Sequence, residues 1–389
     1  MELEPIRGNS ERREWRGGSA AGFASEDAMG SVEGAKEIMG ESGDAALLEL
    51  TADLLKKYTN GFSQANFLGN TQFGKLYRGK IPQGSSEAEA QEVTVKIWED
   101  PTICTVHPDD KRSRLADELH FLRHPSVKTQ PNLVKLIGYS CKGEPLGVVY
   151  DLNPLDTLHN LITKDDFNWL QRIKVALGFA DLLAFLHRDA YLPYMVRNID
   201  AEHIMIDQDF NPILLEFGML SGGIFGNMTT MEEKRPRRIW GALGYIDAHL
   251  ASVGNWSVKC DVYSYGILLL SLIGKRVVDK ARAYETAVDQ WAKKEYRPKK
   301  SLFKQKARFS LVHNSLQEES TYAISDGYKI TELAMSCVEY HPGRRPTMQK
   351  FFEDLRALRV VQSNAEAVGI KPDVSAKNPK QGSRFSIRW

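Results

Sequence analysis

Apolar residues recur at helical spacing in the second half of the chain, and this pattern predicts its main helices. Between Asn168 and His187 the apolar side chains share one face: Leu170, Ile173, Ala176, Leu177, Ala180, Leu183 and Leu186. This spacing predicts one long helix that packs against a core. A second apolar run, Tyr265 to Ile273, predicts a buried helix. It is shorter than the roughly 18 residues needed to cross a bilayer, so we expect no transmembrane segment.

Short apolar runs in the first half of the chain are typical of buried strands. We predict three strands there: Val93–Lys96, Asn132–Tyr139 and Leu146–Leu152. The amphipathic stretch Leu47–Phe62 predicts a helix ahead of these strands. A further helix is predicted around Glu118, where three apolar residues share a face: Leu115, Leu119 and Leu122.

Both ends of the chain lack periodic apolar residues. Residues 1–44 are rich in Gly, Ser, Ala and Glu, and residues 361–389 are polar and mildly basic. Such segments bury too little apolar surface to fold, so we expect both to be disordered. We therefore predict one folded domain at residues 45–360. At 389 residues with 42% hydrophobic content, the chain is long enough to bury a large core.

Charge and cysteine content narrow the environment of the protein. The formal net charge is +1, which gives no reason to expect a nucleic-acid partner. The four cysteines have no metal-site spacing and favour free thiols in a reducing cytosol: Cys104, Cys141, Cys260 and Cys337. Two basic runs, Lys234–Arg238 and Lys293–Arg308, indicate either a solvated surface or a docking patch for an acidic partner or an anionic membrane.

The stretch from Tyr194 to Met219 contains polar residues at the spacing of a catalytic loop and a metal-binding loop. Val196-Arg197-Asn198 is followed by His203 and then by Glu216-Phe217-Gly218. This order resembles the protein-kinase sequence H-R-D-x-x-x-x-N followed by D-F-G. In that family the first Asp is the catalytic base, and the Asn and the second Asp hold Mg²⁺.

Each departure from the family sequence weakens the expected chemistry. Asn198 has a neutral amide that cannot take up a proton, so the catalytic base is lost. His203 offers an imidazole that suits softer metals than Mg²⁺, and Glu216 keeps a carboxylate one methylene farther out. We therefore expect His203 to be a degenerate metal position and Glu216 to bind metal weakly. Asp200 reverses the charge where the family usually has Lys.

The rate that these losses leave is very small. Losing general-base help costs about 10²–10⁴ in rate, and losing metal stabilisation costs roughly another 10³. From a kinase turnover of about 1–100 s⁻¹, on the order of one event per day remains. The chain is therefore predicted to be a pseudokinase.

The nucleotide-binding motifs of the kinase family have partial counterparts here. Phe67 to Gly79, FLGNTQFGKLYRG, resembles the glycine-rich hairpin that covers ATP phosphates. Gly69 and Gly74 stand, but Thr71 replaces the middle glycine, and an ordinary hairpin turn would explain the same letters. Lys96 matches the family's lysine that contacts the α- and β-phosphates, and Glu118 matches the glutamate of helix C that pairs with this lysine. In a pseudokinase this pair is either nucleotide-binding or purely structural.

Other positions follow from the same resemblance. Tyr150 falls at the gatekeeper position, and Asp151 and Asn153 would carry the backbone groups that bind adenine. The resemblance implies structural roles for Asp261, which would accept backbone hydrogen bonds from the catalytic loop, and for Arg345, which would bind a buried carboxylate. Two further positions depart from the family: Ala242 replaces a Thr, and His249 stands where the family has the Glu that pairs with this Arg. We therefore expect the anchor of the activation segment to be altered.

The resemblance covers residues 48 to 358, and it is greatest to plant receptor-like cytoplasmic kinases, through TNGFS, KCDVYSYG and GRRPTM. It implies an α+β, bilobal kinase-like fold, with an N-lobe at about 62–150 and a C-lobe at about 153–360. It also implies weak binding of ATP and Mg. Kinase-dead members of such families commonly act as adaptors or decoys for active kinases, immune receptors or pathogen effectors, in the cytoplasm or at the inner face of the plasma membrane through a partner.

Two other functions fit the same residues. One is a residual or atypical Ser/Thr kinase that uses Glu216 for a single metal, with Lys96 and Glu118 in their usual roles. The other is a switch that binds ATP without turnover and changes its affinity for a partner. Whether another kinase phosphorylates Thr229 or Thr230 is a question that the sequence leaves open.

Overall fold

The computed structural model describes residues 47–83, 90–99, 110–189, 191–226, 241–283, 285–296 and 309–370. Several expectations concern residues outside these ranges: the extension at 1–44, Cys104, Thr229 and Thr230, the run Lys234–Arg238, most of the run Lys293–Arg308, and the tail beyond residue 370. The three cysteines inside the ranges are free thiols, as predicted: Cys141, Cys260 and Cys337.

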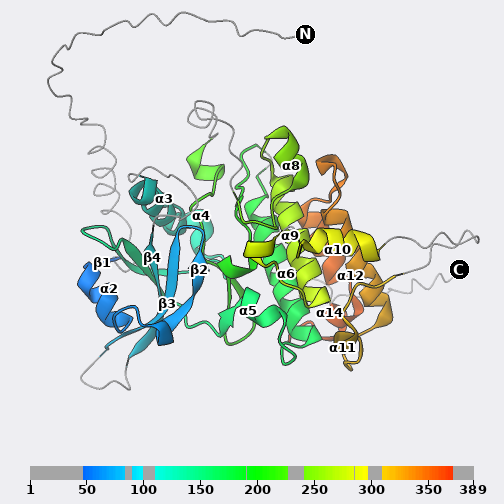
Figure 1. Ribbon diagram of the computed structural model, residues 1–389, viewed down its shortest axis with the longest axis horizontal. Helices are drawn as coiled ribbons and strands as arrows, with labels where there is room; N and C mark the ends of the chain where they lie inside the picture. The colour runs from blue at the N-terminus through cyan, green and yellow to red at the C-terminus, as the bar shows by residue number, and fades with distance from the viewer. Residues whose placement is uncertain are drawn as a thin grey trace, which may run out of the picture. The chain divides into compact units, whose positions relative to one another are not determined.

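The N-lobe is built on a six-stranded sheet with the order β1-β5-β6-β4-β3-β2 (Figure 1). Its strands are β1 (Leu48–Glu49), β2 (Phe67–Thr71), β3 (Gly74–Ile81), β4 (Gln91–Trp98), β5 (Leu136–Ser140) and β6 (Gly147–Tyr150). β1 pairs in parallel with β5, and every other pair is antiparallel. The three strands predicted from apolar runs are confirmed as β4, β5 and β6, with β5 shorter than expected.

A short helix, α2 (Ala52–Tyr58), covers the outer face of this sheet. Leu55 of α2 is fully buried in a small core with Tyr77, Val95 and Val149. The predicted helix at Leu47–Phe62 is wrong at both ends, because Leu48–Glu49 pairs with β5 and Thr51 caps the helix by accepting a hydrogen bond from the Leu54 N–H (3.3 Å).

The other face of the sheet packs against α3 (Asp110–Arg123), which is followed by α4 (Pro125–Lys128). Leu115, Glu118 and Leu122 of α3 are buried, which confirms the predicted inward face. Glu118 is thereby directed into the protein rather than into solvent, and this orientation sets up the site described below.

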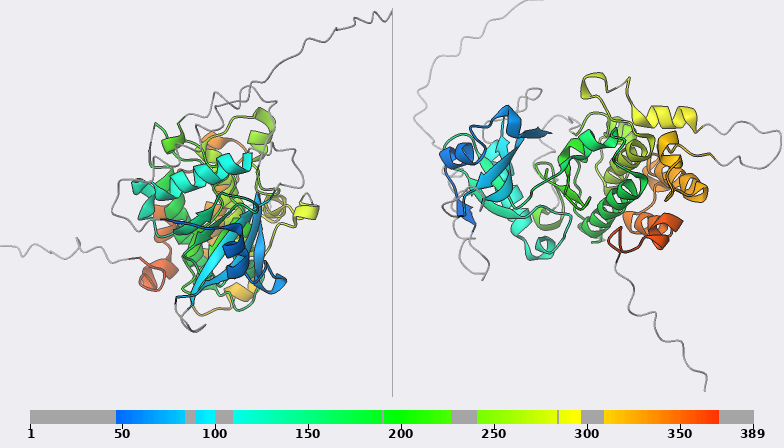
Figure 2. Two further views of the ribbon diagram at one scale, coloured as in Figure 1. Left: turned by 90° about the vertical axis from the view of Figure 1, so that its left-hand side faces the viewer. Right: turned by 90° about the horizontal axis from the view of Figure 1, so that it is seen from below.

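The C-lobe is helical around α6 (Trp169–Leu186) and α9 (Val258–Gly274), and both predicted helices are confirmed. Asn168 begins α6 with a capping box shared with Gln171. The remaining α-helices are α5 (Leu158–Ile162), α8 (Ala248–Val253), α10 (Val288–Glu295), α11 (Asn314–Gln317), α12 (Ile324–Cys337), α13 (Met348–Arg356) and α14 (Arg359–Ser363). Figure 2 shows the last helices of the chain, α12 to α14, coloured orange to red, on the side of the C-lobe away from the sheet. Val361 and Val368 are buried, so the folded part continues past the predicted end at residue 360.

A second, three-stranded sheet and short 3₁₀ turns carry the loops of interest. The strands β7 (Asp156–Thr157), β8 (Ile204–Ile206) and β9 (Pro212–Leu214) lie in the order β7-β8-β9. The 3₁₀ turns are η1 (Gln64–Asn66), η3 (Ala201–His203), η4 (Gly223–Phe225), η5 (Lys280–Arg282) and η6 (Pro342–Arg344). With a sheet-based N-lobe and a helical C-lobe, the fold is α+β and bilobal, as predicted.

One apolar core runs through both lobes without interruption. It joins Leu68, Phe73 and Leu76 of the β2–β3 hairpin to Met205 and Phe217 of the C-lobe. These side chains are at most 8% exposed. The tip of the hairpin is therefore packed onto the C-lobe, in the region where the sequence predicted a nucleotide site.

Candidate functional site

Lys96 and Glu118 form the predicted ion pair at the centre of the site. The Lys96 Nζ atom lies 2.8 Å from Glu118 Oε2, and both side chains are fully buried. Lys96 comes from β4 and Glu118 from α3, so the pair ties the helix to the sheet. Tyr150, at the end of β6, also donates a hydrogen bond to Glu118 through its hydroxyl. The carboxylate is thus held from two sides.

Glu216 shares the same ammonium group. Its Oε1 atom lies 3.4 Å from Lys96 Nζ and accepts a hydrogen bond from the Gly218 N–H (2.8 Å). Burial opposes ionisation of Glu216, but the Lys96 charge and the Gly218 N–H outweigh it and lower the pKa of the carboxyl below 4.5. Burial raises the pKa of Glu118, aided by the charge of Glu216 and opposed by Lys96. One buried cation therefore balances two carboxyl groups of unequal acidity.

The loop at Val196-Arg197-Asn198, which matches the family's catalytic loop, has its backbone held by hydrogen bonds. Asp261 in α9 accepts hydrogen bonds from the N–H groups of Val196 and Arg197, each at 2.8 Å. This confirms the structural role predicted for Asp261. Arg197 adopts a left-handed backbone conformation (φ +64°), which is uncommon for a residue other than glycine. The backbone of this loop is thus held in place by α9.

Asn198 occupies the position of the expected base and is almost fully buried. Neither its amide nitrogen nor its amide oxygen makes a hydrogen bond within the described part of the chain. Its backbone carbonyl accepts a hydrogen bond from Nδ1 of His203 (2.8 Å). The side chain supplies no negative charge and no proton acceptor at this position.

His203 has both ring nitrogens engaged. Nδ1 donates to the Asn198 carbonyl, and Nε2 accepts a hydrogen bond from the backbone N–H of Gln72 at 3.1 Å. The imidazole is therefore neutral with its proton on Nδ1. Gln72 lies at the tip of the β2–β3 hairpin, so His203 connects the two lobes. This contact was not predicted, since nothing in the letters around Gln72 indicates it.

Asp200 is held by a lysine that no motif indicated. Lys280 of η5 places its Nζ atom 2.8 Å from Asp200 Oδ2 and 2.7 Å from Glu202 Oε2. Asp200 also caps η3 by accepting from the Glu202 N–H (3.0 Å). The charge reversal at Asp200 is therefore matched by a cation from a distant part of the C-lobe. The one sign of such a partner in the sequence is that two acidic residues, Asp200 and Glu202, lie close together in the loop.

The glycines of the hairpin are required by packing. A side chain on Gly74 would collide with the Ile97 carbonyl of β4, and one on Gly69 would lie 3.3 Å from a methyl group of Thr157. Gly74 is thus needed for sheet pairing whether or not phosphate binds. Thr71, in the place of the middle glycine, lies beside the Glu216 carboxylate and contributes to its lowered pKa.

The hinge residues are exposed and partly engaged within the chain. The Asp151 N–H donates to the Lys135 carbonyl (2.9 Å), and the Asn153 carbonyl accepts from the Gln208 side chain (3.5 Å). Arg78 of β3 donates to the carbonyls of Pro154 (2.7 Å) and Leu155 (2.8 Å). The roles of Asp151 and Asn153 in adenine binding stay predictions.

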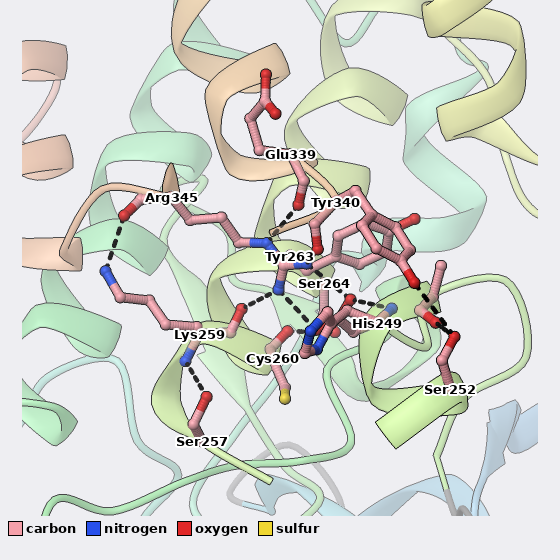
Figure 3. Close-up of polar contacts among 12 residues, drawn as sticks. His249, Ser252, Ser257, Lys259, Cys260, Tyr263, Ser264, Glu339, Tyr340 and Arg345 are labelled. Atoms are coloured by element: carbon pink, nitrogen blue, oxygen red, sulfur yellow. Dashed lines mark hydrogen bonds and ion pairs between the residues drawn. The ribbon is translucent and has the colours of Figure 1, made fainter. Parts of the chain in front are cut away.

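The anchor of the activation segment is altered at position 249, as expected, but it keeps a carboxylate, which Asp247 supplies. Asp247 forms a bidentate buried pair with Arg345, with N–O distances of 2.6 and 2.7 Å. Arg345 also donates to the backbone carbonyls of Lys259 (2.8 Å) and Glu339 (2.7 Å), as Figure 3 shows. Asp247 precedes the expected position by two residues and supplies the charge that His249 lacks.

His249 is displaced towards the surface. Its ring packs against Tyr340 with centroids 5.5 Å apart and lies 6.4 Å from the ring of His341. A sequence search that allowed a shift of two residues would have found Asp247, because it is the nearest acidic residue before the expected position.

The residues at the centre of the site do not fit a Mg²⁺-bound nucleotide. Both His203 nitrogens are engaged, and the Oε1 atom of Glu216 is bound to Lys96 and Gly218. In the described ranges no group of three or more His, Cys, Asp or Glu side chains could hold a metal ion. Mg²⁺ needs several oxygen ligands in near-octahedral geometry. We therefore assign no catalytic step to a metal here.

Comparison with known proteins places this geometry in context. Residues 62–355 match the family described as protein tyrosine and serine/threonine kinase. The probable serine/threonine-protein kinase PBL12 of Arabidopsis thaliana is 32% identical, over 86% of this chain and 73% of that protein. The EPD1-interacting receptor-like cytoplasmic serine/threonine-protein kinase 5D of Gossypium barbadense is 33% identical, over 80% of this chain and 64% of that protein. None of the helices described in the structure has both the length and the apolar character to span a membrane.

Proposed function

Since this chain belongs to the protein tyrosine and serine/threonine kinase family and is homologous to plant receptor-like cytoplasmic kinases, we propose that it is a pseudokinase that acts by binding other proteins. The observation that carries this proposal is Asn198 at the position of the catalytic base. A kinase base must accept, or at least orient with negative charge, the proton of the substrate hydroxyl. The buried amide of Asn198 does neither.

Asp200 is the nearest acidic residue that could replace the base, and its surroundings argue against that role. It is 1% exposed, its carboxylate is paired with Lys280, and it caps η3. A base has to reach the substrate hydroxyl at about 2.6–3.2 Å. Asp200 would have to give up both its ion pair and its cap to do so.

The binding partners that we propose are active receptor-like kinases, immune receptors or pathogen effectors, met in the cytoplasm or at the inner face of the plasma membrane. One relative is named as an EPD1-interacting kinase, which is a statement about that protein. Support for a binding role in this chain comes from its preserved framework. The Asp261 contacts and the Asp247–Arg345 pair keep a kinase-like surface in place while the chemistry is lost.

A transfer assay tests the proposal. The full chain is incubated with radiolabelled ATP, Mg²⁺ or Mn²⁺, and a general substrate such as myelin basic protein. We expect no incorporation above that of the Lys96→Ala variant. Incorporation by the wild type that Lys96→Ala abolishes would refute the pseudokinase assignment.

A binding assay tests the other half of the proposal. We expect the wild type and the Glu216→Ala variant to bind an active receptor-like kinase with equal affinity, with or without ATP. Loss of binding in that variant, on a protein that still melts cooperatively, would show that binding depends on the catalytic centre.

A residual Ser/Thr kinase is the second candidate, and one observation favours it. The Lys96–Glu118 pair at 2.8 Å, with Glu216 close by, retains the arrangement expected of a working nucleotide site. This candidate predicts slow transfer that is lost in both Lys96→Ala and Glu216→Ala. Activity that survives in both variants comes from a contaminating kinase.

A further inference from the structure

Three contacts hold the tip of the β2–β3 hairpin against the C-lobe. The first is the hydrogen bond from the Gln72 N–H to His203 Nε2 at 3.1 Å. His203 is itself fixed by its bond to the Asn198 carbonyl, and it is fully buried. The imidazole therefore acts as a rigid bridge from the catalytic loop to the hairpin.

The second contact is made by Phe73, which is 3% exposed. Its ring lies so close to Gly218 that a side chain there would come within 2.7 Å of Phe73 Cδ2. The guanidinium of Arg114 lies over the Phe73 ring, 4.2 Å from its centroid, and also donates a hydrogen bond to the Gly218 carbonyl. Phe73 is thus enclosed between α3 and the Glu216-Phe217-Gly218 stretch.

The third contact lies along β2. β2 packs against β7 and η3, and a side chain added at Gly69 would lie 3.3 Å from a methyl group of Thr157 in β7. Together with Gln72 and Phe73, these residues place the hairpin directly on the residues predicted to receive phosphate and metal.

We propose that residues Thr71–Phe73 close the nucleotide site from within, and that His203 is the latch that holds them there. The inference deepens the pseudokinase proposal on which it rests, because it assigns a conformational role to the residues that replaced the catalytic ones. His203, which stands where the family has an asparagine, accepts a hydrogen bond from the Gln72 N–H across the lobe interface. The class of ligand excluded is the nucleoside polyphosphate.

Burial of the whole charged centre supports this closure. Four side chains of this centre are fully buried: Lys96, Glu118, His203 and Glu216. Phosphates could reach Lys96 only after the hairpin had lifted from Gly218 and His203. They would then face the carboxyl groups of Glu118 and Glu216 with no metal ligands to offset the repulsion.

The latch makes nucleotide affinity depend on how often the hairpin opens. A ligand that binds only the open form has its apparent affinity reduced by the fraction of open molecules. Weakening the latch should raise that fraction and should tighten nucleotide binding without adding any new contact to the nucleotide.

Fluorescent nucleotide titration tests this prediction. Mant-ATP is titrated into the full-length wild type, His203→Asn, Phe73→Ala and the control His249→Asn, which removes a histidine outside the site. We expect no saturable binding by the wild type or the control. Both hairpin variants should bind saturably, with an apparent Kd at least about tenfold below the lower limit that the titration sets for the wild type. Saturable wild-type binding that Lys96→Ala weakens would overturn the proposal. So would absence of binding in both hairpin variants while they still melt cooperatively.

Amide exchange reports on the latch without any nucleotide. In the wild type the Gln72 amide should be protected, and in His203→Asn it should exchange about tenfold faster or more, with the amides of β3 and β4 unchanged. An unprotected Gln72 amide in the wild type, or equal exchange in the variant, would exclude the latch. The two proposals fail separately: nucleotide binding without transfer overturns the latch alone, whereas phosphoryl transfer overturns the pseudokinase assignment.

Discussion

Arg345 satisfies its buried guanidinium with one carboxylate and three backbone carbonyls. Within the described residues, Asp247 is the one carboxylate paired with this guanidinium, and both side chains are at most 1% exposed. Removing one partner of a buried pair leaves the other charged and without compensation, which is far more costly than losing a surface pair.

We therefore predict that Asp247→Asn lowers the free energy of unfolding by about 3–5 kcal/mol. His249→Gln, two residues away, should cost less than about 1 kcal/mol, because its ring packs at the surface with Tyr340. Urea denaturation of the two variants measures both losses. Equal losses would mean that Asp247 is not the residue that anchors the segment.

The ion pair between Lys280 and Asp200 predicts that the free energy of unfolding depends on pH. Burial by itself would raise the pKa of Asp200, but the charge and hydrogen bond of Lys280 and the Glu202 N–H lower it below its usual 3.8. A depressed carboxyl pKa stabilises the fold above the unfolded pKa, and this stabilisation is lost as pH falls through the folded value.

Lys280→Met should accordingly cost about 1–3 kcal/mol near neutral pH, because Asp200 and Glu202 lose their shared cation. The difference from the wild type should shrink as pH falls below 3.8. Thermal unfolding between pH 3 and pH 7 measures it. A difference that stays constant down to pH 3 would show that the ion pair is not its source.

The sequence predicted some residues of this site and missed others for a physical reason. Lys96, Glu118 and Asp261 stand in motifs whose spacing is tied to strand, helix and loop positions, so their contacts followed from the resemblance. Lys280 contacts Asp200 through tertiary packing over 80 residues of sequence, and no local pattern indicates that contact. Asp247 was missed for a smaller reason, because it lies two residues before the position where the family has its Glu.

At the scale of elements, α2 stabilises the N-lobe by covering the outer face of its sheet. Leu55 is fully buried there, and its side chain lies directly over Gly147 of β6. Helix propensity over Leu47–Phe62 predicted a longer helix. Pairing of Leu48 with Gly138 competes with helix formation and determines where α2 begins.

Leu55→Ala should destabilise the fold by about 2–5 kcal/mol, since it removes a buried side chain and leaves a cavity. Lys56→Ala, on the exposed face of the same helix, should change the free energy of unfolding by less than about 0.5 kcal/mol. Chemical denaturation followed by tryptophan fluorescence compares them. If the two variants unfold at the same urea concentration, α2 does not support the sheet.

The β2–β3 hairpin shows why glycines that match a family motif are weak indicators of function. Gly74 would be needed for pairing of β3 with β4 in any version of this sheet, and Gly69 for contact with Thr157. Their presence therefore says nothing about phosphate. The informative position is His203, whose ring accepts a hydrogen bond from the Gln72 N–H that the sequence alone did not indicate.

For the whole molecule, the proposed loss of phosphoryl transfer and the proposed closure of the lobe interface are linked. The core runs from the hairpin into the C-lobe, and the charged centre lies buried between them. Restoring one catalytic residue therefore addresses only one of three obstacles: the missing base, the missing metal ligands and the closed hairpin.

We predict that Asn198→Asp alone yields no measurable phosphoryl transfer. The combined variant Asn198→Asp, His203→Asn, Glu216→Asp and Thr71→Gly should transfer phosphate in a Mg²⁺-dependent manner, because base and metal contribute about 10²–10⁴ and roughly 10³ respectively. Asp200 is left unchanged, since a lysine there would face the Lys280 ammonium. Transfer to myelin basic protein, with Lys96→Ala added as the control, measures the gain. Robust transfer by Asn198→Asp alone would mean that the base was the only part missing, and that neither the metal position nor the hairpin limits the reaction.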